Sequence, residues 1–424
     1  MNPLDLLKYN RFDVCAKLLY IDFYLKNYKS KWGEEVYLSH LKVWNNFKEG
    51  SDLSKNGPDI FMDRFNSIIN SMSDDGFNKA HPIVLNFANL LMNGSHRLSS
   101  AIYHKLDVPY EILDESHGHG QSACSYNYFR NKKNFVSTGL EPKYMDAMAK
   151  EYCKYKKNAF LLFLFDDDAS NLGKVESIIS QKSNIVYKKD IALSKNGAIN
   201  LIWHIYYGEP WLGQPERGNM SAACVKFDLA FKEKSLAEMK IYLIEVEGED
   251  PQGVVVDLKN HIRSVCKGGR HSCHINDTHK ETTFLADIVF NDNSLFAIDH
   301  YKYNKDFDMF NKLFLRVKAS STDRNDFCIV SSSLLGLFGV RDVKDIDYIS
   351  RGDVPLLADV AGTGNHLSEK HYYGQSFDDI IYNPTNHFHF NGVKFCTLDV
   401  LRTMKQKRNE EKDIKDIELI KGLV

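Results

Sequence analysis

The chain has 424 residues, which is longer than chains that usually fold around a single hydrophobic core, so two or three domains are expected. Its 54 Lys and Arg residues almost balance its 56 Asp and Glu residues, which argues against a surface for nucleic acid or anionic lipid but leaves small phosphorylated ligands open. The eight cysteines form no Cys-x-x-Cys pair, the longest apolar run is only residues 159–165, and the N-terminus lacks a signal-peptide layout. We therefore expect a cytoplasmic protein without a transmembrane segment, which reaches the inner membrane only through partners.

The first part of the chain predicts helices followed by a small α/β unit. Apolar residues recur at helical spacing over residues 4–28 and again over 60–72. Two short strands are expected at 82–85 and 90–92, and helical spacing returns over 98–106. The local order is therefore strand, glycine turn and helix.

The middle of the chain predicts a mixture of helices and strands. A polar stretch at 115–133 indicates the first linker, a helix is expected over 141–156, and the apolar run that follows suits a buried strand. Residues 199–246 are predicted to be rich in β-structure, with 241–246 the clearest strand.

The last part of the chain opens with a helix start. Thr278 is followed three residues later by Glu281, which is the pattern of a capping box. Strands are expected at 327–330 and 345–349, and a basic helix over 398–423. Together the elements predict an α+β multidomain protein with domains at 1–130, 131–320 and 321–424.

The segment Asn93-Gly94-Ser95-His96-Arg97 predicts an anion-binding turn at the start of a helix. Gly94 permits a positive φ and a close approach of the backbone, and the helix start offers unpaired N–H groups. Arg97 adds a planar fork of donors that suits phosphate. The alternative is a plain glycine turn in which Ser95 caps the helix and Arg97 faces solvent.

This loop, with Ser99-Ser-Ala-Ile102 and Val108-Pro109 after it, resembles the Gly-x-His-Arg loop of sulfiredoxin and ParB-like nucleotide-binding domains. The resemblance implies that Asn93, Gly94, Ser95, His96 and Arg97 hold phosphate, although Asn93 stands where the family usually has Asp. A ParB-like nucleotide-binding regulator that acts on DNA is one resulting interpretation. The near-neutral charge and the lack of a helix-turn-helix pattern argue against it.

A second set of residues is Ser331 to Gly339 followed by Asp345-Ile-Asp347. Carboxylates at alternate positions of a strand point to the same face and suit one Mg²⁺ that bridges phosphate oxygens. The pattern resembles the nucleotidyltransferase superfamily, which implies Asp345 and Asp347 as catalytic metal ligands and Arg341 as a substrate ligand. The third carboxylate of that family is missing near Phe388-His-Phe390, and an exposed acidic strand end is the alternative.

A third set surrounds the start of the helix at Thr278. These polar residues are predicted to converge on an anion or a sugar hydroxyl, with Asp277 as general base: Lys259, Arg263, His274, Asn276, Asp277 and Thr278. Zinc is a weaker alternative because no standard ligand spacing occurs among the nearby His and Cys residues. Residues that only cap and turn the chain are the other alternative.

Across most of its length the chain resembles a family encoded in bacterial lipopolysaccharide and capsule loci. The resemblance rests on the three sets above together with Arg11-Phe-Asp13, Lys17, Tyr20, Tyr144-Met-Asp-Ala-Met148 and Glu209-Pro-Trp-Leu-Gly213. It implies a ribofuranosyltransferase that uses phosphoribosyl pyrophosphate as donor, a glycan as acceptor and Mg²⁺ as cofactor. A separate phosphatase would then remove the 5-phosphate.

The sequence thus predicts a glycosyltransferase in which the three polar sets meet in one donor site, with Asp277, Asp345 and Asp347 as the catalytic residues. Transfer of a nucleotidyl group to a sugar phosphate or glycan is the alternative. The sequence therefore predicts phosphate chemistry more firmly than it predicts the acceptor.

Overall fold

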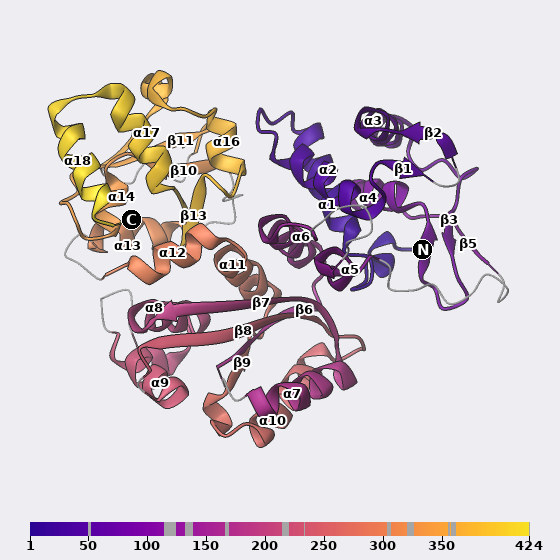
Figure 1. The fold of residues 1–424 in the computed structure, drawn as a ribbon, viewed down its shortest axis with the longest axis horizontal. Coiled ribbons are helices and arrows are strands. Elements are labelled where there is room, and N and C mark those ends of the chain that lie inside the picture. Colours follow the sequence, from indigo (N-terminus) through magenta and orange to yellow (C-terminus); the bar gives the residue numbers. More distant parts are fainter. Residues whose placement is uncertain are drawn as a thin grey trace.

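The structure is a computed structural model. It describes residues 1–49, 52–113, 124–131, 139–165, 169–213, 220–232, 234–302, 307–319, 326–354, 357 and 362–423. The described residues form four sheets, one of them a two-stranded ribbon (β1-β2). We name the parts of the chain around the three larger sheets the N-terminal unit (residues 1–131), the middle unit (139–302) and the C-terminal unit (307–423) (Figure 1). The mixed α+β character that the sequence predicts is confirmed.

The N-terminal unit packs helices against a small sheet in the order β4-β3-β5. Its elements are η1 (Pro3–Leu6), α1 (Asp13–Leu25), α2 (Trp32–Asn45), β1 (Lys48–Glu49), β2 (Asp52–Asn56), α3 (Pro58–Asp75), β3 (Ile83–Leu85), β4 (Leu91–Asn93), α4 (Ser95–His104), β5 (Tyr110–Ile112) and α5 (Tyr126–Asn131). The single helix predicted over 4–28 is interrupted because Arg11 forms a β-bridge with Cys124 and the Phe12 N–H donates to the Cys124 carbonyl.

The middle unit has an antiparallel sheet in the order β7-β8-β6-β9, with α7 and α10 against one face (Figure 1). Its elements are α6 (Pro142–Tyr155), β6 (Ala159–Leu164), α7 (Ala169–Lys182), β7 (Asn184–Ser194), α8 (Lys195–Ile205), η3 (Pro210–Leu212), α9 (Ser221–Phe231), β8 (Leu236–Glu245), α10 (Pro251–Val265), η5 (Gly269–His271), β9 (Cys273–Ile275), α11 (His279–Val289) and α12 (Asp292–His300).

The prediction of β-structure over 199–246 was wrong for most of that range. Residues up to Ile205 continue α8, a second helix runs to Phe231, and among the described residues of this range only β8 is a strand. In α9 the buried residues Ala223, Phe227 and Phe231 recur every fourth position, which is the spacing of one helical face. Aromatic and β-branched content favoured a strand here, but the periodicity is helical.

The C-terminal unit has a mixed sheet in the order β12-β11-β10-β14-β13. Its elements are α13 (Phe307–Ala319), β10 (Phe327–Val330), α14 (Ser333–Leu337), β11 (Ile346–Ser350), β12 (Thr363–Asn365), η6 (Leu367–Tyr372), α16 (Phe377–Tyr382), β13 (His387–Phe390), β14 (Val393–Cys396), α17 (Leu398–Arg408) and α18 (Glu411–Lys421). The predicted tail helix is divided because Asn409 takes φ 54° and Glu410 then begins a new capping box.

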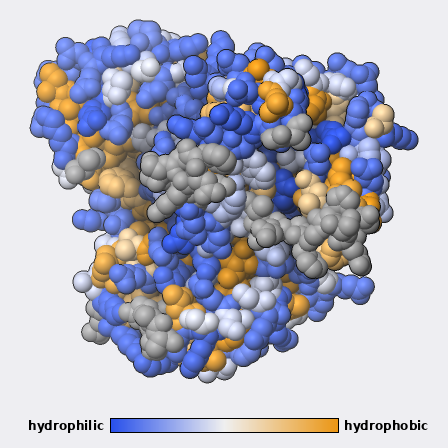
Figure 2. Space-filling view, turned by 45° about the vertical axis from the view of Figure 1, so that its right-hand side comes forward, coloured by the Kyte–Doolittle hydropathy of each residue, from blue (hydrophilic) through white to orange (hydrophobic). Residues whose placement is uncertain are grey.

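The three units share one interior. A single hydrophobic cluster runs through all of them, Phe12 stacks on Tyr187 at 5.9 Å between ring centroids, and Tyr28 stacks on Tyr382 at 3.7 Å. Each main sheet lies inside one predicted domain range. Because the units share a core, the structure does not define where one domain ends, and the domain bounds stay predictions. The face in Figure 2 is mainly hydrophilic, with apolar residues in small groups. Within the described ranges, no helix is both long and apolar enough to cross a lipid bilayer.

Candidate functional site

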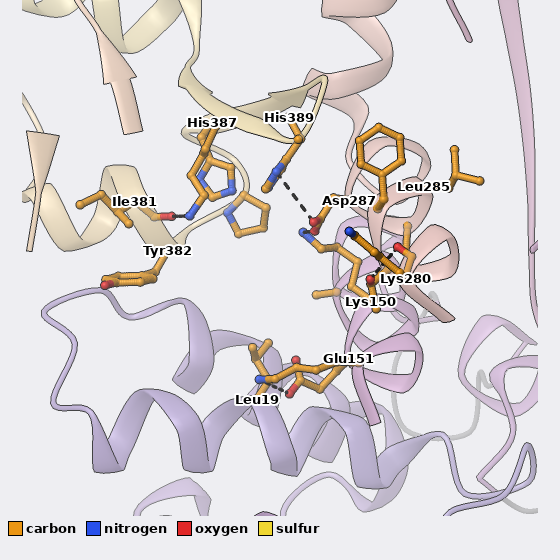
Figure 3. A pocket seen from close by; sticks show the side chains of 18 of the residues that line it. Leu19, Lys150, Glu151, Lys280, Leu285, Asp287, Ile381, Tyr382, His387 and His389 are labelled. Carbon is orange, nitrogen blue, oxygen red and sulfur yellow. Dashed lines mark hydrogen bonds and ion pairs between the residues drawn. The ribbon is translucent and has the colours of Figure 1, made fainter. Parts of the chain in front are cut away.

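A cavity of about 740 Å³ lies where the three units meet, and we call it the inter-unit cavity (Figure 3). Its walls come from α1 of the N-terminal unit, α6 and α11 of the middle unit, and the end of α16 with the β13–β14 hairpin of the C-terminal unit. This volume is typical of a small-molecule site. Since all three units contribute, the cavity depends on their packing.

Helices α6 and α11 place the polar residues of the middle unit. α11 packs against both α6 and β13, and its start is the predicted capping box, in which the Thr278 hydroxyl accepts from the Glu281 N–H. The fixed helix start sets the direction of α11, which carries Asp287 into the cavity. There Asp287 forms an ion pair with Lys150 of α6, at 2.8 Å.

Asp287 also faces His389 on β13, with 3.9 Å between Oδ2 and Nδ1 (Figure 3). Burial alone would raise the pKa of Asp287, but the charge of Lys150 and the nearby His389 lower that pKa to about 2. Burial lowers the pKa of His389 to about 3, against the opposing charge of Asp287. At neutral pH the pair is therefore an ionised carboxylate beside a neutral imidazole.

Two further basic groups on the hairpin complete this wall. The Nδ1–H of His387 donates to the Ile380 carbonyl at 2.9 Å, so its Nε2 is an acceptor. Lys394 donates to the Ile381 carbonyl at 2.6 Å, and burial lowers its pKa to about 8. An anion in the cavity would favour the charged form of this lysine.

The other charged residues of the cavity are mostly paired. Lys154 lies 3.2 Å from Glu151, and Lys26 lies 3.2 Å from Asp22. Lys280 lines the cavity with no carboxylate within ion-pairing distance in the part of the chain that is described. The charge of Lys280 is therefore available to a ligand in the cavity.

His204 of α8 also lines the cavity, in ring contact with Phe284 of α11 and Phe390 of β13. Its Nδ1–H donates to the Asn200 carbonyl at 2.7 Å, its ring stacks on Phe284, and its buried Nε2 has no hydrogen-bond partner in the described part of the chain. Burial lowers the pKa of His204 to about 4. This imidazole is therefore also neutral at neutral pH.

The predicted loop at Asn93 has the expected backbone. Gly94 takes φ 97°, and α4 begins directly after it. Arg97 donates to the His81 carbonyl at 2.7 Å. The His96 ring packs into the helical cluster, with its Nε2 3.0 Å from the Tyr37 hydroxyl and its ring in an edge-to-face contact with Phe65. This geometry leaves the backbone N–H groups and Arg97 to contact an anion.

The residues around Thr278 have mainly structural partners. Asn276 is fully buried, its Oδ1 accepts from the Leu161 N–H, and its Nδ2 donates to the Thr278 carbonyl and the Thr282 hydroxyl. Asp277, predicted as a base, forms an ion pair with Lys259 at 2.5 Å. We therefore assign Asn276 to holding β6 against α11, in place of the predicted ligand contact.

Arg341 also has structural partners. It forms an ion pair with Asp416 and donates to the Ser332 hydroxyl at 2.9 Å. Lys405 joins the same network, 2.5 Å from Asp416 and 3.1 Å from Asp413, with no exposed surface. This network ties α17 and α18 to the turn after β10.

Asp345 is exposed just before β11, and Asp347 Oδ2 lies 4.0 Å from His366 Nε2. Among the described residues no group of three His, Cys, Asp or Glu side chains is arranged as a metal site. Two carboxylates at alternate positions suffice only if phosphate and water complete the Mg²⁺ shell.

The structure does not bring the three predicted sets together. They belong to three different sheets (Figure 1), and Thr278 is the only one of their members that lines the inter-unit cavity. The sequence analysis missed Lys150, Asp287 and His389. The sequence did contain a signal for this site. His387 and His389 stand two residues apart, as side chains on one face of a strand do, but only a carboxylate was sought in this stretch.

The chain was also compared with known proteins. No protein-family model, no curated protein and no solved structure matches it. The geometry of the inter-unit cavity and the sequence pattern are therefore the grounds for a function.

Proposed function

We propose that this chain is a glycosyltransferase whose reaction takes place in the inter-unit cavity. The donor would be phosphoribosyl pyrophosphate, and a 5-phosphoribosyl group would pass to a hydroxyl of a glycan in surface-polysaccharide synthesis. The observation that carries the site is Asp287, held between Lys150 and His389 in the wall of a cavity of about 740 Å³. The choice of donor rests on the family resemblance of the sequence.

His389 suits the part of general base. The carboxylate of Asp287 favours the tautomer with its proton on Nδ1, which leaves Nε2 to take the proton of the acceptor hydroxyl. The acceptor oxygen then bonds to C1 of the ribose, the bond from C1 to the pyrophosphate oxygen breaks, and pyrophosphate leaves with the electron pair. Asp287 stays ionised and stabilises both the imidazolium and the positive charge that develops on the sugar.

Lysines of the cavity suit the anionic donor. Lys150, Lys280 and Lys394 all line it, and a bound pyrophosphate would offset their positive charges. Since Lys150 and Lys394 both lower the pKa of His389, a bound anion would raise that pKa toward the range of an effective base. Mg²⁺ bound to the donor phosphates would neutralise further charge.

The donor assignment is tested by the release of pyrophosphate. Purified protein with Mg²⁺, phosphoribosyl pyrophosphate and a panel of glycan acceptors should release pyrophosphate and form a phosphorylated glycan. A product that still carries the 5-phosphate would also explain the need for a separate phosphatase. Consumption of a nucleotide sugar, with no pyrophosphate released from the pentose donor, would contradict the assignment.

Nucleotidyl transfer is the second candidate, and it would use the C-terminal unit. It is favoured by the succession of β10, a serine turn, α14 and β11, which puts Asp347 on the strand paired with β10. Lys405 donates to the Ser332 hydroxyl in that turn at 3.0 Å. This candidate predicts that CTP or ATP, and not the pentose donor, raises the melting temperature.

A further inference from the structure

Basic side chains gather at one end of the middle sheet, away from the inter-unit cavity. They come from α9 (Lys226), α10 (Arg263), η5 (Arg270 and His271) and β9 (His274), and we call them the basic cluster. None of them lines the inter-unit cavity. The sequence analysis selected Arg263 and His274 as ligands, and the fold brings Lys226 of α9 to the same place.

Direct contacts hold the basic cluster together. Lys226 Nζ lies 3.3 Å from His271 Nδ1, and Arg270 Nε lies 3.2 Å from the other ring nitrogen of the same histidine. Arg263 donates to the Cys273 carbonyl at 3.4 Å, next to His274 in the strand. His271 thus lies between Lys226 and Arg270, and the charge of Arg263 also acts on Lys226.

The cluster has more donors than acceptors. His271 has a cationic donor at each ring nitrogen, but a neutral imidazole accepts at only one of them. Lys226 and Arg270 therefore compete for the one acceptor nitrogen of this ring. The buried Nε–H of Arg263 has no acceptor among the described residues, which is costly for a buried group.

The charge of the cluster is also uncompensated. Lys226 has only 8% of its surface exposed, yet neither it nor Arg263 or Arg270 has a carboxylate within ion-pairing distance among the described residues. Burial and the charges of Arg263 and Arg270 lower the pKa of Lys226 to about 8. A buried cation such as Lys226 is unfavourable unless an anion compensates its charge.

Aromatic rings border the cluster. The Lys226 ammonium lies 5.4 Å from the ring centroid of Tyr206 and 5.7 Å from that of Phe165. Tyr206 packs edge-on against Trp211, which is 46% exposed. An organic group attached to a bound anion would therefore meet an aromatic surface.

We propose that the basic cluster is a second anion site, which binds the phosphate group of a phosphorylated ligand through Lys226, Arg263, Arg270 and His271. Phosphate oxygens supply the acceptors and the negative charge that the cluster lacks. This site does not depend on the proposed transferase reaction, because it lies outside the inter-unit cavity.

Calorimetry of the full chain with inorganic phosphate and with pyrophosphate tests this site, in buffer free of other oxyanions. Wild-type protein should bind with saturation, and Lys226→Met should bind about tenfold or more weakly. Lys240→Met is the matched control, since it removes one lysine charge from the same unit, where Lys240 on β8 pairs with Asp190 on the surface. This control should bind like the wild type.

Two further variants make the result specific. Arg270→Gln changes an exposed residue and should weaken binding without affecting the fold, even if Lys226→Met does not fold. Lys150→Met alters the inter-unit cavity and should leave binding at the cluster unchanged. No binding by the wild type, unchanged binding by Lys226→Met and Arg270→Gln, or a loss confined to Lys150→Met would each overturn the proposal.

Discussion

Asp287 on α11 and His389 on β13 belong to different units, yet 3.9 Å separates Oδ2 from Nδ1 where both line the inter-unit cavity. Lys150 on α6 fixes the carboxylate from the other side at 2.8 Å. The arrangement resembles the acid–imidazole pairs that activate hydroxyl groups in many enzymes. It requires the middle and C-terminal units to stay packed, so substitutions at this contact test both the site and the assembly of the units.

Asp287→Asn should lower turnover with the pentose donor by about 100-fold or more, because the amide cannot hold the negative charge that stabilises His389 and the sugar. Pyrophosphate release measures this effect. Asp292→Asn is the control, since Asp292 also pairs with a lysine but is largely exposed. Equal activity of the two variants would show that Asp287 has no part in the reaction.

The Arg97→Ala variant distinguishes between two candidate donor sites, the inter-unit cavity and the loop at Gly94 that the sequence predicted. The substitution removes the bond to the His81 carbonyl and should cost about 1 kcal/mol or less of unfolding free energy. If the donor binds in the inter-unit cavity, its KM should not change. A raised KM with a normal melting curve would show that the donor binds at the loop that contains Gly94.

His204→Phe should make the protein less sensitive to acid. In the fold, burial lowers the pKa of His204 to about 4, whereas the unfolded chain takes up this proton near pH 6.5. Between these values the unfolded state binds more protons, so the unfolding free energy falls as pH falls, by about 1.4 kcal/mol per pH unit for this group.

Denaturant unfolding between pH 6.5 and 4 measures that slope. It should be shallower in His204→Phe, while His300→Phe, whose ring stacks on Phe296, serves as control. The same slope in wild type and His204→Phe would show that His204 is not held neutral.

Asp416→Asn should destabilise the C-terminal unit by about 3 kcal/mol, because it leaves part of the buried charge of Lys405 unmatched and removes the ion-pair partner of half-buried Arg341. Glu411→Gln removes an exposed i,i+4 pair with Lys415 and should change stability by about 0.5 kcal/mol at most. Urea unfolding compares the two variants. Similar small losses would mean that the network does not stabilise the tail helices.

Local features of the fold followed from the sequence. The Thr278–Glu281 capping box and the strand at 327–330 were predicted because their signals lie within a few residues. The helices at 199–231 were mistaken for strands, since their aromatic and β-branched residues favour strands although the spacing of the buried residues is helical. Most of the correct predictions thus depended on signals from residues that are close together in the sequence.

The candidate site could not be predicted from local signals in the sequence. Lys150, Asp287 and His389 lie far apart in the chain, and the packing of three units brings them together. Arg341 and Asn276 look like ligands in the sequence because nothing local reveals Asp416 or the Leu161 N–H as their partners. The basic cluster was missed in part because Lys226 comes from a helix predicted as a strand.

The most direct test of the account is His389→Gln, assayed for pyrophosphate release from phosphoribosyl pyrophosphate with a glycan acceptor. His300→Gln serves as control, since it changes a histidine that does not line the cavity. We predict that His389→Gln loses about 100-fold or more of its turnover while its melting temperature and that of the control stay close to wild type. Wild-type turnover in a folded His389→Gln protein would contradict the inter-unit cavity as the site of the reaction.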